Sequence, residues 1–99
     1  MLLTILYVGR DAEITTVMER LLNARPEWTG IAVCSDEEAI SVCEKLHLDL
    51  VLLGNGIDEE CEQVLKKNLT SIRPDLKIIQ HYGGGSGLLY GEILQAILS

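Results

Sequence analysis

Short apolar runs alternate with amphipathic stretches along the chain. The clearest run is residues 48–56, Leu-Asp-Leu-Val-Leu-Leu-Gly-Asn-Gly, which ends abruptly in two glycines around an asparagine. Such a run is typical of a strand that is buried on both faces at the centre of a parallel sheet. Residues 2–9, 28–35 and 76–82 are the other predicted strands. Because the run 28–35 is less apolar than the run 2–9, we expect it at an edge of the sheet.

Each predicted strand is followed by apolar positions that repeat with the period of a helix. Pro26 ends the first helix, since the residue before a proline is pushed out of the helical region. Ser35 and Glu38 have the spacing of a capping box at the start of the second. The third is expected over 58–71 and the fourth over 88–98. The positions expected to face the sheet are Ile14, Val17, Met18, Leu21, Leu22, Ala39, Ile40, Cys43, Leu46, Cys61, Val64, Leu65, Leu69, Ile72, Leu89, Ile93, Leu94 and Ile97.

The order of the elements predicts the fold class. Four strands that alternate with four helices indicate an α/β protein, with a parallel sheet between two layers of helices. Right-handed crossovers leave few topologies for such a chain. We expect a doubly wound, three-layer αβα arrangement with four parallel strands in the order 2-1-3-4. A length of 99 residues predicts one domain, residues 1–99.

The composition is that of an acidic, aliphatic protein, with a net charge of −7, one Trp and no Phe. A surface for nucleic acid or for anionic lipid needs clustered Lys and Arg, so neither partner is expected. No apolar run reaches the length of about 18 residues that spans a membrane. The N-terminus also lacks the basic stretch and cleavage site of a signal peptide. We therefore expect a soluble, cytoplasmic protein.

The cysteines are odd in number and lack metal-ligand spacing. Cys34, Cys43 and Cys61 form no Cys-x-x-Cys pair, and His47 and His81 do not complete a site. We interpret all three cysteines as small buried hydrophobes in a reducing compartment. Neither a metal ion nor a cofactor is expected.

Four stretches together carry a resemblance to a known family. They are residues 5–11 (Ile-Leu-Tyr-Val-Gly-Arg-Asp), 34–40 (Cys-Ser-Asp-Glu-Glu-Ala-Ile), 48–54 (Leu-Asp-Leu-Val-Leu-Leu-Gly) and 73–79 (Arg-Pro-Asp-Leu-Lys-Ile-Ile). They resemble the receiver domain of bacterial two-component response regulators, over about the first 82 residues. The resemblance implies a flavodoxin-like fold and a role in signal transduction.

The departures from that family concern its chemistry. A receiver takes phosphate on an aspartate at the end of its third strand, where this chain has Gly54. Gly9 and Arg10 occupy the positions of the acidic pair that holds Mg²⁺, and Tyr82 that of a Thr or Ser. The last helix-strand unit of a receiver has no counterpart. The resemblance therefore implies a truncated, degenerate pseudo-receiver, in which Asp11 belongs to the first helical turn.

Three loops are expected to meet at the carboxyl ends of the strands, where open α/β sheets bind ligands. One interpretation is a small anion site, in which a cation and hydrogen-bonding groups meet glycine amides at a helix N-terminus. The other is a set of tight strand-to-helix turns, which use glycine for its conformational freedom. The run 83–87, Gly-Gly-Gly-Ser-Gly, matches neither a P-loop nor a dinucleotide fingerprint. The candidate anion-site residues are Arg10, Asn55, His81, Tyr82, Gly84 and Ser86.

No catalytic residue is predicted. The unperturbed pKa of a histidine would suit His81 to general-base catalysis, yet no nucleophile candidate beyond Ser86 lies near it, and Ser86 is better interpreted as a helix cap. The acids of residues 58–62 are more typical of a helix start than of a cation site. A small phosphocarrier domain would carry a cysteine just after the first strand, where Gly9 and Arg10 stand.

Two hypotheses for function follow. The leading one is a non-phosphorylatable interaction module in bacterial signalling, which docks on a protein partner or dimerises and does not catalyse a reaction. Because the fourth strand lacks its neighbour, we expect a homodimer through this strand and the last helix, or a partner at the same surface. The alternative is a sensor of small anions that uses Arg10 and the loop 83–86.

Overall fold

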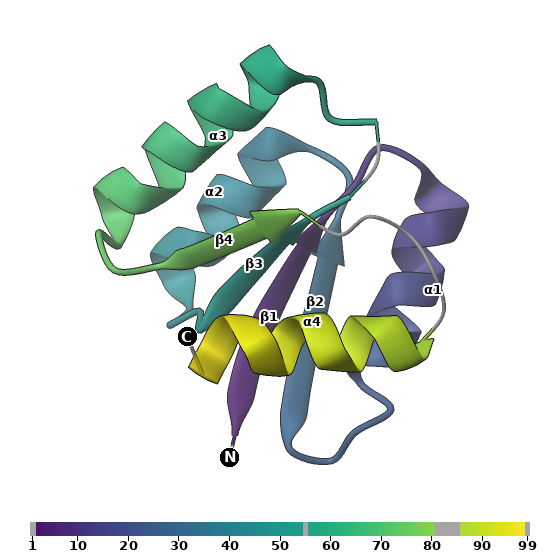
Figure 1. Cartoon of the computed structure of the whole chain (residues 1–99). Helices are drawn as coiled ribbons and strands as arrows, with labels where there is room; N and C mark the ends of the chain where they lie inside the picture. The colour runs from purple at the N-terminus through teal and green to yellow at the C-terminus, as the bar shows by residue number, and fades with distance from the viewer. Residues whose placement is uncertain (1, 55, 81–85, 99) are drawn as a thin grey trace.

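The computed structural model describes residues 2–54, 56–80 and 86–98, and for residues 86–90 it describes the backbone alone. The strands and helices alternate without exception in this part of the chain (Figure 1). They are β1 (Leu3–Val8), α1 (Ala12–Leu22), β2 (Trp28–Val33), α2 (Asp36–Lys45), β3 (Leu50–Leu53), α3 (Glu59–Ile72), β4 (Lys77–Gln80) and α4 (Ser86–Leu98).

The sheet is parallel and has the strand order β2-β1-β3-β4, which confirms the predicted topology. The register places Val8 of β1 opposite Val33 of β2 on one side and Leu53 of β3 on the other. Leu53 lies opposite Gln80 of β4. The carboxyl ends of all four strands therefore lie level with one another, and the loops that follow them begin at the same edge.

The helices cover both faces of the sheet, as expected for three layers (Figure 1). Helices α1 and α4 pack on one face and α2 and α3 on the other. The first core consists of Leu3, Ile5, Tyr7, Met18, Leu22, Trp28, Leu50, Leu52, Ile93 and Ala96. The second consists of Leu6, Val8, Val33, Ala39, Cys43, Leu48, Val51, Leu53, Leu65, Leu69 and Leu76. Alternate residues of β1 and β3 enter opposite cores, as the pleat requires.

The buried face of α1 differs from the prediction. Ile14 and Val17, which were expected inside, are 50% and 45% exposed. Met18 and Leu22 are buried as predicted, and Thr15 is buried as well. The Thr15 hydroxyl donates to the Asp11 carbonyl oxygen at 2.7 Å, so its burial leaves no polar group unsatisfied. The helix is therefore rotated toward the stripe of Thr15, and two β-branched residues face solvent.

Helices α2 and α3 each bury a narrower stripe than predicted. Their buried residues are one turn apart: Ala39 and Cys43 in α2, and Leu65 and Leu69 in α3. Leu46, Val64 and Ile72 were expected inside and are exposed. Leu46 has already left the helix, because it is the C-cap of α2 with an extended backbone. A helix that lies on a flat sheet buries only the positions that point straight at it.

One further prediction on a single residue is wrong. Cys34 was interpreted as a buried hydrophobe and is exposed, because β2 ends one residue before it. Trp28 is buried in the first core at the start of β2, and the Arg25 guanidinium lies 5.5 Å from its ring centre. Over the described part of the chain, no helix is both long and apolar enough to cross a membrane.

Candidate functional site

The candidate site lies where β1, β2 and β3 end and their helices begin. An acidic or hydroxyl side chain caps each of these helices. Asp11 accepts from the Ile14 amide at 3.0 Å, Ser35 from the Glu38 amide at 3.2 Å, and Asp58 from the Cys61 amide at 2.8 Å. The predicted capping box is offset by one residue: Glu38 accepts from the amide of Cys34, not of Ser35. The caps fix where each helix starts.

Tyr7 fills the space at which the side chains of residues 9 and 54 would meet. A Cβ atom added to Gly54 would overlap the Tyr7 hydroxyl oxygen and would lie 3.0 Å from Cε2 of the ring. A Cβ added to Gly9 would lie 2.7 Å from Cε1 of the same ring and 2.9 Å from Thr15 Oγ1. The phenol therefore lies over the ends of β1 and β3. Both glycines are required here because a tyrosine occupies the place of their side chains.

The Tyr7 phenol is buried and uncharged. Its residue is 2% exposed. The pKa of Tyr7 is raised above its ordinary value, first by burial and then by the nearby Cys34 and Asp11. Each of these influences disfavours a phenolate. The group at the centre of this site is thus a neutral ring that fills space, and it is neither a nucleophile nor a metal ligand.

Arg10 bridges the loop after β1 to the start of α2. Its guanidinium donates to Asp36 Oδ1 at 2.8 Å and to the Gly9 carbonyl oxygen at 3.2 Å. The hydrogen bond to Asp36 is the main reason why the pKa of Arg10 is raised. Gly56, with a φ of 92°, turns the loop after β3 over the Arg10 stem, and a Cβ there would lie 3.2 Å from that of Arg10. The cation of the site is therefore already paired within the chain.

The start of α3 adds a second acidic group and a thiol. The Asp58 carboxylate accepts from the Cys61 amide, which lowers the pKa of Asp58. The interaction of Cys61 with Asp58 raises the pKa of the Cys61 thiol. A thiol that keeps its proton is a poor nucleophile. The interaction with Asp58 therefore opposes ionisation of the Cys61 thiol.

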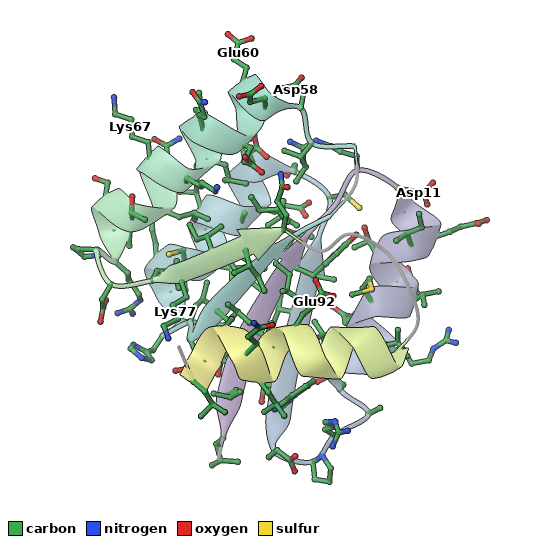
Figure 2. All side chains as sticks on the ribbon, viewed as in Figure 1. Asp11, Asp58, Glu60, Lys67, Lys77 and Glu92 are labelled. Atoms are coloured by element: carbon green, nitrogen blue, oxygen red, sulfur yellow. The ribbon has the colours of Figure 1, made fainter. Side chains whose placement is uncertain are left out.

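Carboxylates outnumber cations at this end of the molecule. Figure 2 shows Asp11 at the start of α1, and Asp58 and Glu60 at the start of α3. The acids in the caps and first turns of α1, α2 and α3 are Asp11, Glu13, Asp36, Glu37, Glu38, Asp58, Glu59, Glu60 and Glu62. Their field repels anions. An anion that binds Arg10 would have to displace Asp36 and also enter this negative potential.

The structure describes half of the predicted site residues. Gly9, Arg10 and Gly54 lie together at the ends of β1 and β3. Ser86 is the first residue of α4, but its side chain is not described. Asn55, His81, Tyr82 and Gly84 lie outside the described residues, so the anion site stays a prediction. Among the described residues, no group of three or more His, Cys, Asp and Glu side chains is placed to hold a metal ion.

Sequence reasoning did not find Tyr7 or Asp36. The signal for Tyr7 was present: it stands two positions before Gly9 in a strand, so the two residues share a face of the sheet. A bulky residue beside two glycines at neighbouring strand ends indicates that one side chain occupies the space of two. Asp36 carried no such signal, because its partner Arg10 is 26 residues away in the sequence.

Three of the solved structures that this chain resembles are receiver or response regulator domains. One is the receiver domain of the hybrid histidine kinase CckA, with 19% identity, a TM-score of 0.72, and coverage of 95% of this chain and 98% of that one. Another is the response regulator domain of Thermotoga maritima CheB, with 14% identity, a TM-score of 0.72, and coverage of 100% and 98%. A CheY-like receiver domain from Methylobacillus flagellatus has 15% identity, a TM-score of 0.74, and coverage of 98% and 99%.

This chain has the receiver-domain fold. No protein-family model and no curated protein matches its sequence. The receiver fold thus confirms the fold class and the resemblance found from the four sequence stretches. At such low identity the likeness extends to the fold, and the chemistry has to be argued from the residues of the site.

Proposed function

We propose that this chain is a receiver-like interaction module in bacterial signal transduction that accepts no phosphoryl group and acts by docking. The observation that carries the proposal is the position of Tyr7. In receivers an aspartate at the end of the third strand takes the phosphate. Here that position is Gly54, and a side chain at Gly54 would overlap the Tyr7 hydroxyl oxygen.

The charge at the site supports the same proposal. Mg²⁺ is bound through oxygen ligands, above all carboxylates. At the two positions where receivers carry acids, this chain has Gly9 without a side chain and Arg10 with a positive one. Arg10 in turn forms an ion pair with Asp36 at 2.8 Å. A guanidinium here neutralises a carboxylate without any metal, so the loops are held together in one state.

The docking role is inferred from the surface that a receiver scaffold presents to its partners. A receiver communicates by presenting different surfaces in its phosphorylated and unphosphorylated states. A chain without the acceptor presents one surface at all times. Its binding to a partner then depends on its concentration and on that of the partner, and not on a kinase.

The test is phosphoryl uptake measured by intact-mass spectrometry. The protein is incubated with Mg²⁺ and acetyl phosphate beside a receiver that carries the aspartate. We expect an adduct on that control and none on this chain. A stable adduct on this chain would overturn the proposal, because it would reveal an acceptor other than residue 54. A retained inorganic phosphate, released by Arg10→Ala, would favour anion sensing instead.

The role of Tyr7 is tested by a double-mutant cycle. Gly54→Ala is expected to destabilise the protein, because the new methyl group overlaps the phenol. In the background of Tyr7→Val the same change should cost much less, since the ring is gone. Equal costs in both backgrounds would mean that Tyr7 does not determine the need for glycine at position 54.

A further inference from the structure

The sheet has two edges, and the chain closes one of them with side chains. At β2, the Asn23 amide donates to the Gly30 carbonyl oxygen at 2.8 Å, and its oxygen accepts from the Gly30 amide at 2.9 Å. Glu19 Oε2 accepts from the Ala32 amide at 3.0 Å. Helix α1 thus occupies backbone groups of β2 that another strand would need. An edge treated in this way resists pairing with a further chain.

The edge at β4 is built differently. Among the described residues, Ile78 and Ile79 have strand partners on one side only, in β3. The side chains at the two ends of β4 are directed into its own subunit. Lys77 Nζ donates to the carbonyl oxygens of Ala96 and Ile97 at the end of α4, at 2.7 and 3.2 Å, and Gln80 donates to Glu62 of α3. The lysine therefore does not serve as an outward-facing charge that guards the edge.

The distribution of charge over the surface favours this edge over the others as the place for a second copy of the chain. The net charge of −7 makes two copies repel each other. The carboxylates gather at the starts of α1, α2 and α3, whereas the 13 residues of α4 include one charged residue, Glu92. On α3, Glu62 beside β4 is neutralised by Lys66 at 3.6 Å. Figure 2 shows Lys77 of β4 beside the carboxyl end of α4. Two acidic copies therefore experience the least electrostatic repulsion when they approach each other through the surface around β4.

We propose that two copies pair through β4 about a two-fold axis perpendicular to the sheet, to give a continuous eight-stranded sheet. This inference rests on the docking function above and names its partner. The axis pairs β4 antiparallel with its copy and keeps each helix layer on its own side. In this arrangement, side chains that lie opposite one another must point to the same face of the sheet. Either Ile78 or Ile79 can therefore lie at the axis, opposite its own copy. Cross-strand pairs of β-branched residues stabilise sheets.

Electrostatics selects Ile79 as the residue at the axis. With Ile79 opposite its copy, the two Lys77 residues are separated by four positions along the strands, about 13 Å. With Ile78 at the axis the separation is about half of that, about 7 Å. Because like charges repel at short range, the register centred on Ile79 is favoured. It pairs Ile78 with Gln80 of the second copy.

The experiment measures mass and hydrogen exchange over a range of protein concentrations. Native mass spectrometry and light scattering should give a dimer that dissociates on dilution. The amide of Ile78, which faces away from β3, should become more protected as the dimer forms, while the Gly30 amide on the closed edge stays unchanged. Ile79→Lys should raise the dissociation constant of the dimer by about tenfold or more, because it places two lysines opposite each other.

The matched control is Ile31→Lys, a half-buried isoleucine on β2, the other edge strand. It should leave the dissociation constant unchanged if it folds, as checked by circular dichroism. Exchange in the unmutated protein tests the proposal even if both variants unfold. A monomer at all concentrations, or a dimer whose Ile78 amide does not change, overturns it. A monomer that takes no phosphoryl group would overturn this inference alone, and a dimer that takes one would overturn the proposed function alone.

Discussion

Strands β2 and β4 are the two edges of one parallel sheet, yet their backbone groups are treated in opposite ways. At β2, Asn23 and Glu19 of α1 satisfy the amide and carbonyl groups of Gly30 and the amide of Ala32. At β4, the side chains of Lys77 and Gln80 reach inward, to α4 and α3. An edge is therefore closed by the helix beside it and not by the strand itself. One edge of the sheet is thus closed by α1, and the other is the edge at which we propose a second copy.

The largest effect is expected from Gly30→Ala, which disrupts the closed edge. A Cβ at this position would overlap the Cβ of the buried Leu22, an atom fixed to the α1 backbone. Helix α1 would have to move outward and lose its contacts with β2. We expect the free energy of unfolding in urea to fall by about 3 kcal/mol.

The control is Gly91→Ala in α4, where an added Cβ meets nothing within 4 Å. Alanine is the better helix former, so this variant should be stabilised by about 0.5–1 kcal/mol. If Gly30→Ala were as stable as Gly91→Ala, the close approach of α1 to β2 would be refuted.

The next effect concerns Asn23, which closes the edge by hydrogen bonds alone. Asn23→Ala removes the amide that pairs with both backbone groups of Gly30. Leaving these part-buried groups unsatisfied should cost about 2 kcal/mol in urea unfolding. The Gly30 amide should also exchange faster. Asn68→Ala on exposed α3 is the control and should change stability by less than about 0.5 kcal/mol. An unchanged exchange rate at Gly30 would contradict this account of the edge.

Substitution of Lys77 tests how much its hydrogen bonds from β4 to the end of α4 contribute to stability. Lys77→Met keeps the aliphatic stem and removes the ammonium that donates to Ala96 and Ile97 at the end of α4. A lost charged hydrogen bond at a helix C-terminus should lower the free energy of unfolding by about 1.5 kcal/mol. Exchange of the last α4 amides should accelerate. Lys67→Met on the exposed side of α3 is the control, and an equal effect there would rule out a specific role for Lys77.

The two edges also differ in how far the sequence predicts them. The low apolarity of residues 28–35 correctly indicated an edge strand, because the alternation of burial is a local property. The closure of that edge was not predictable, since it depends on side chains of α1 that meet β2 only after folding. The open edge was predicted from the resemblance, through the missing neighbour of the fourth strand.

The candidate site shows the same limit. Gly9, Arg10 and Gly54 were located from sequence because strand ends follow from the apolar runs. The overlap of the Tyr7 ring with both glycine positions, and the pairing of Arg10 with Asp36, depend on the register between strands and on the reach of side chains. The same holds for Ile14 and Val17, whose helical spacing is correct but whose face is set by how α1 lies on the sheet.

The smallest effect is expected at Glu19, the outer group of the closed edge. Its carboxylate accepts from the Ala32 amide at 3.0 Å in an exposed position, where water competes for the same amide. Glu19→Ala should therefore lower the free energy of unfolding by only about 0.5 kcal/mol. Glu19→Gln keeps an acceptor oxygen and should cost less still. The sharper readout is hydrogen exchange at Ala32, which should accelerate in Glu19→Ala and stay nearly unchanged in Glu19→Gln. If exchange at Ala32 accelerates equally in both variants, the charge of Glu19 matters more for this hydrogen bond than the presence of an acceptor oxygen.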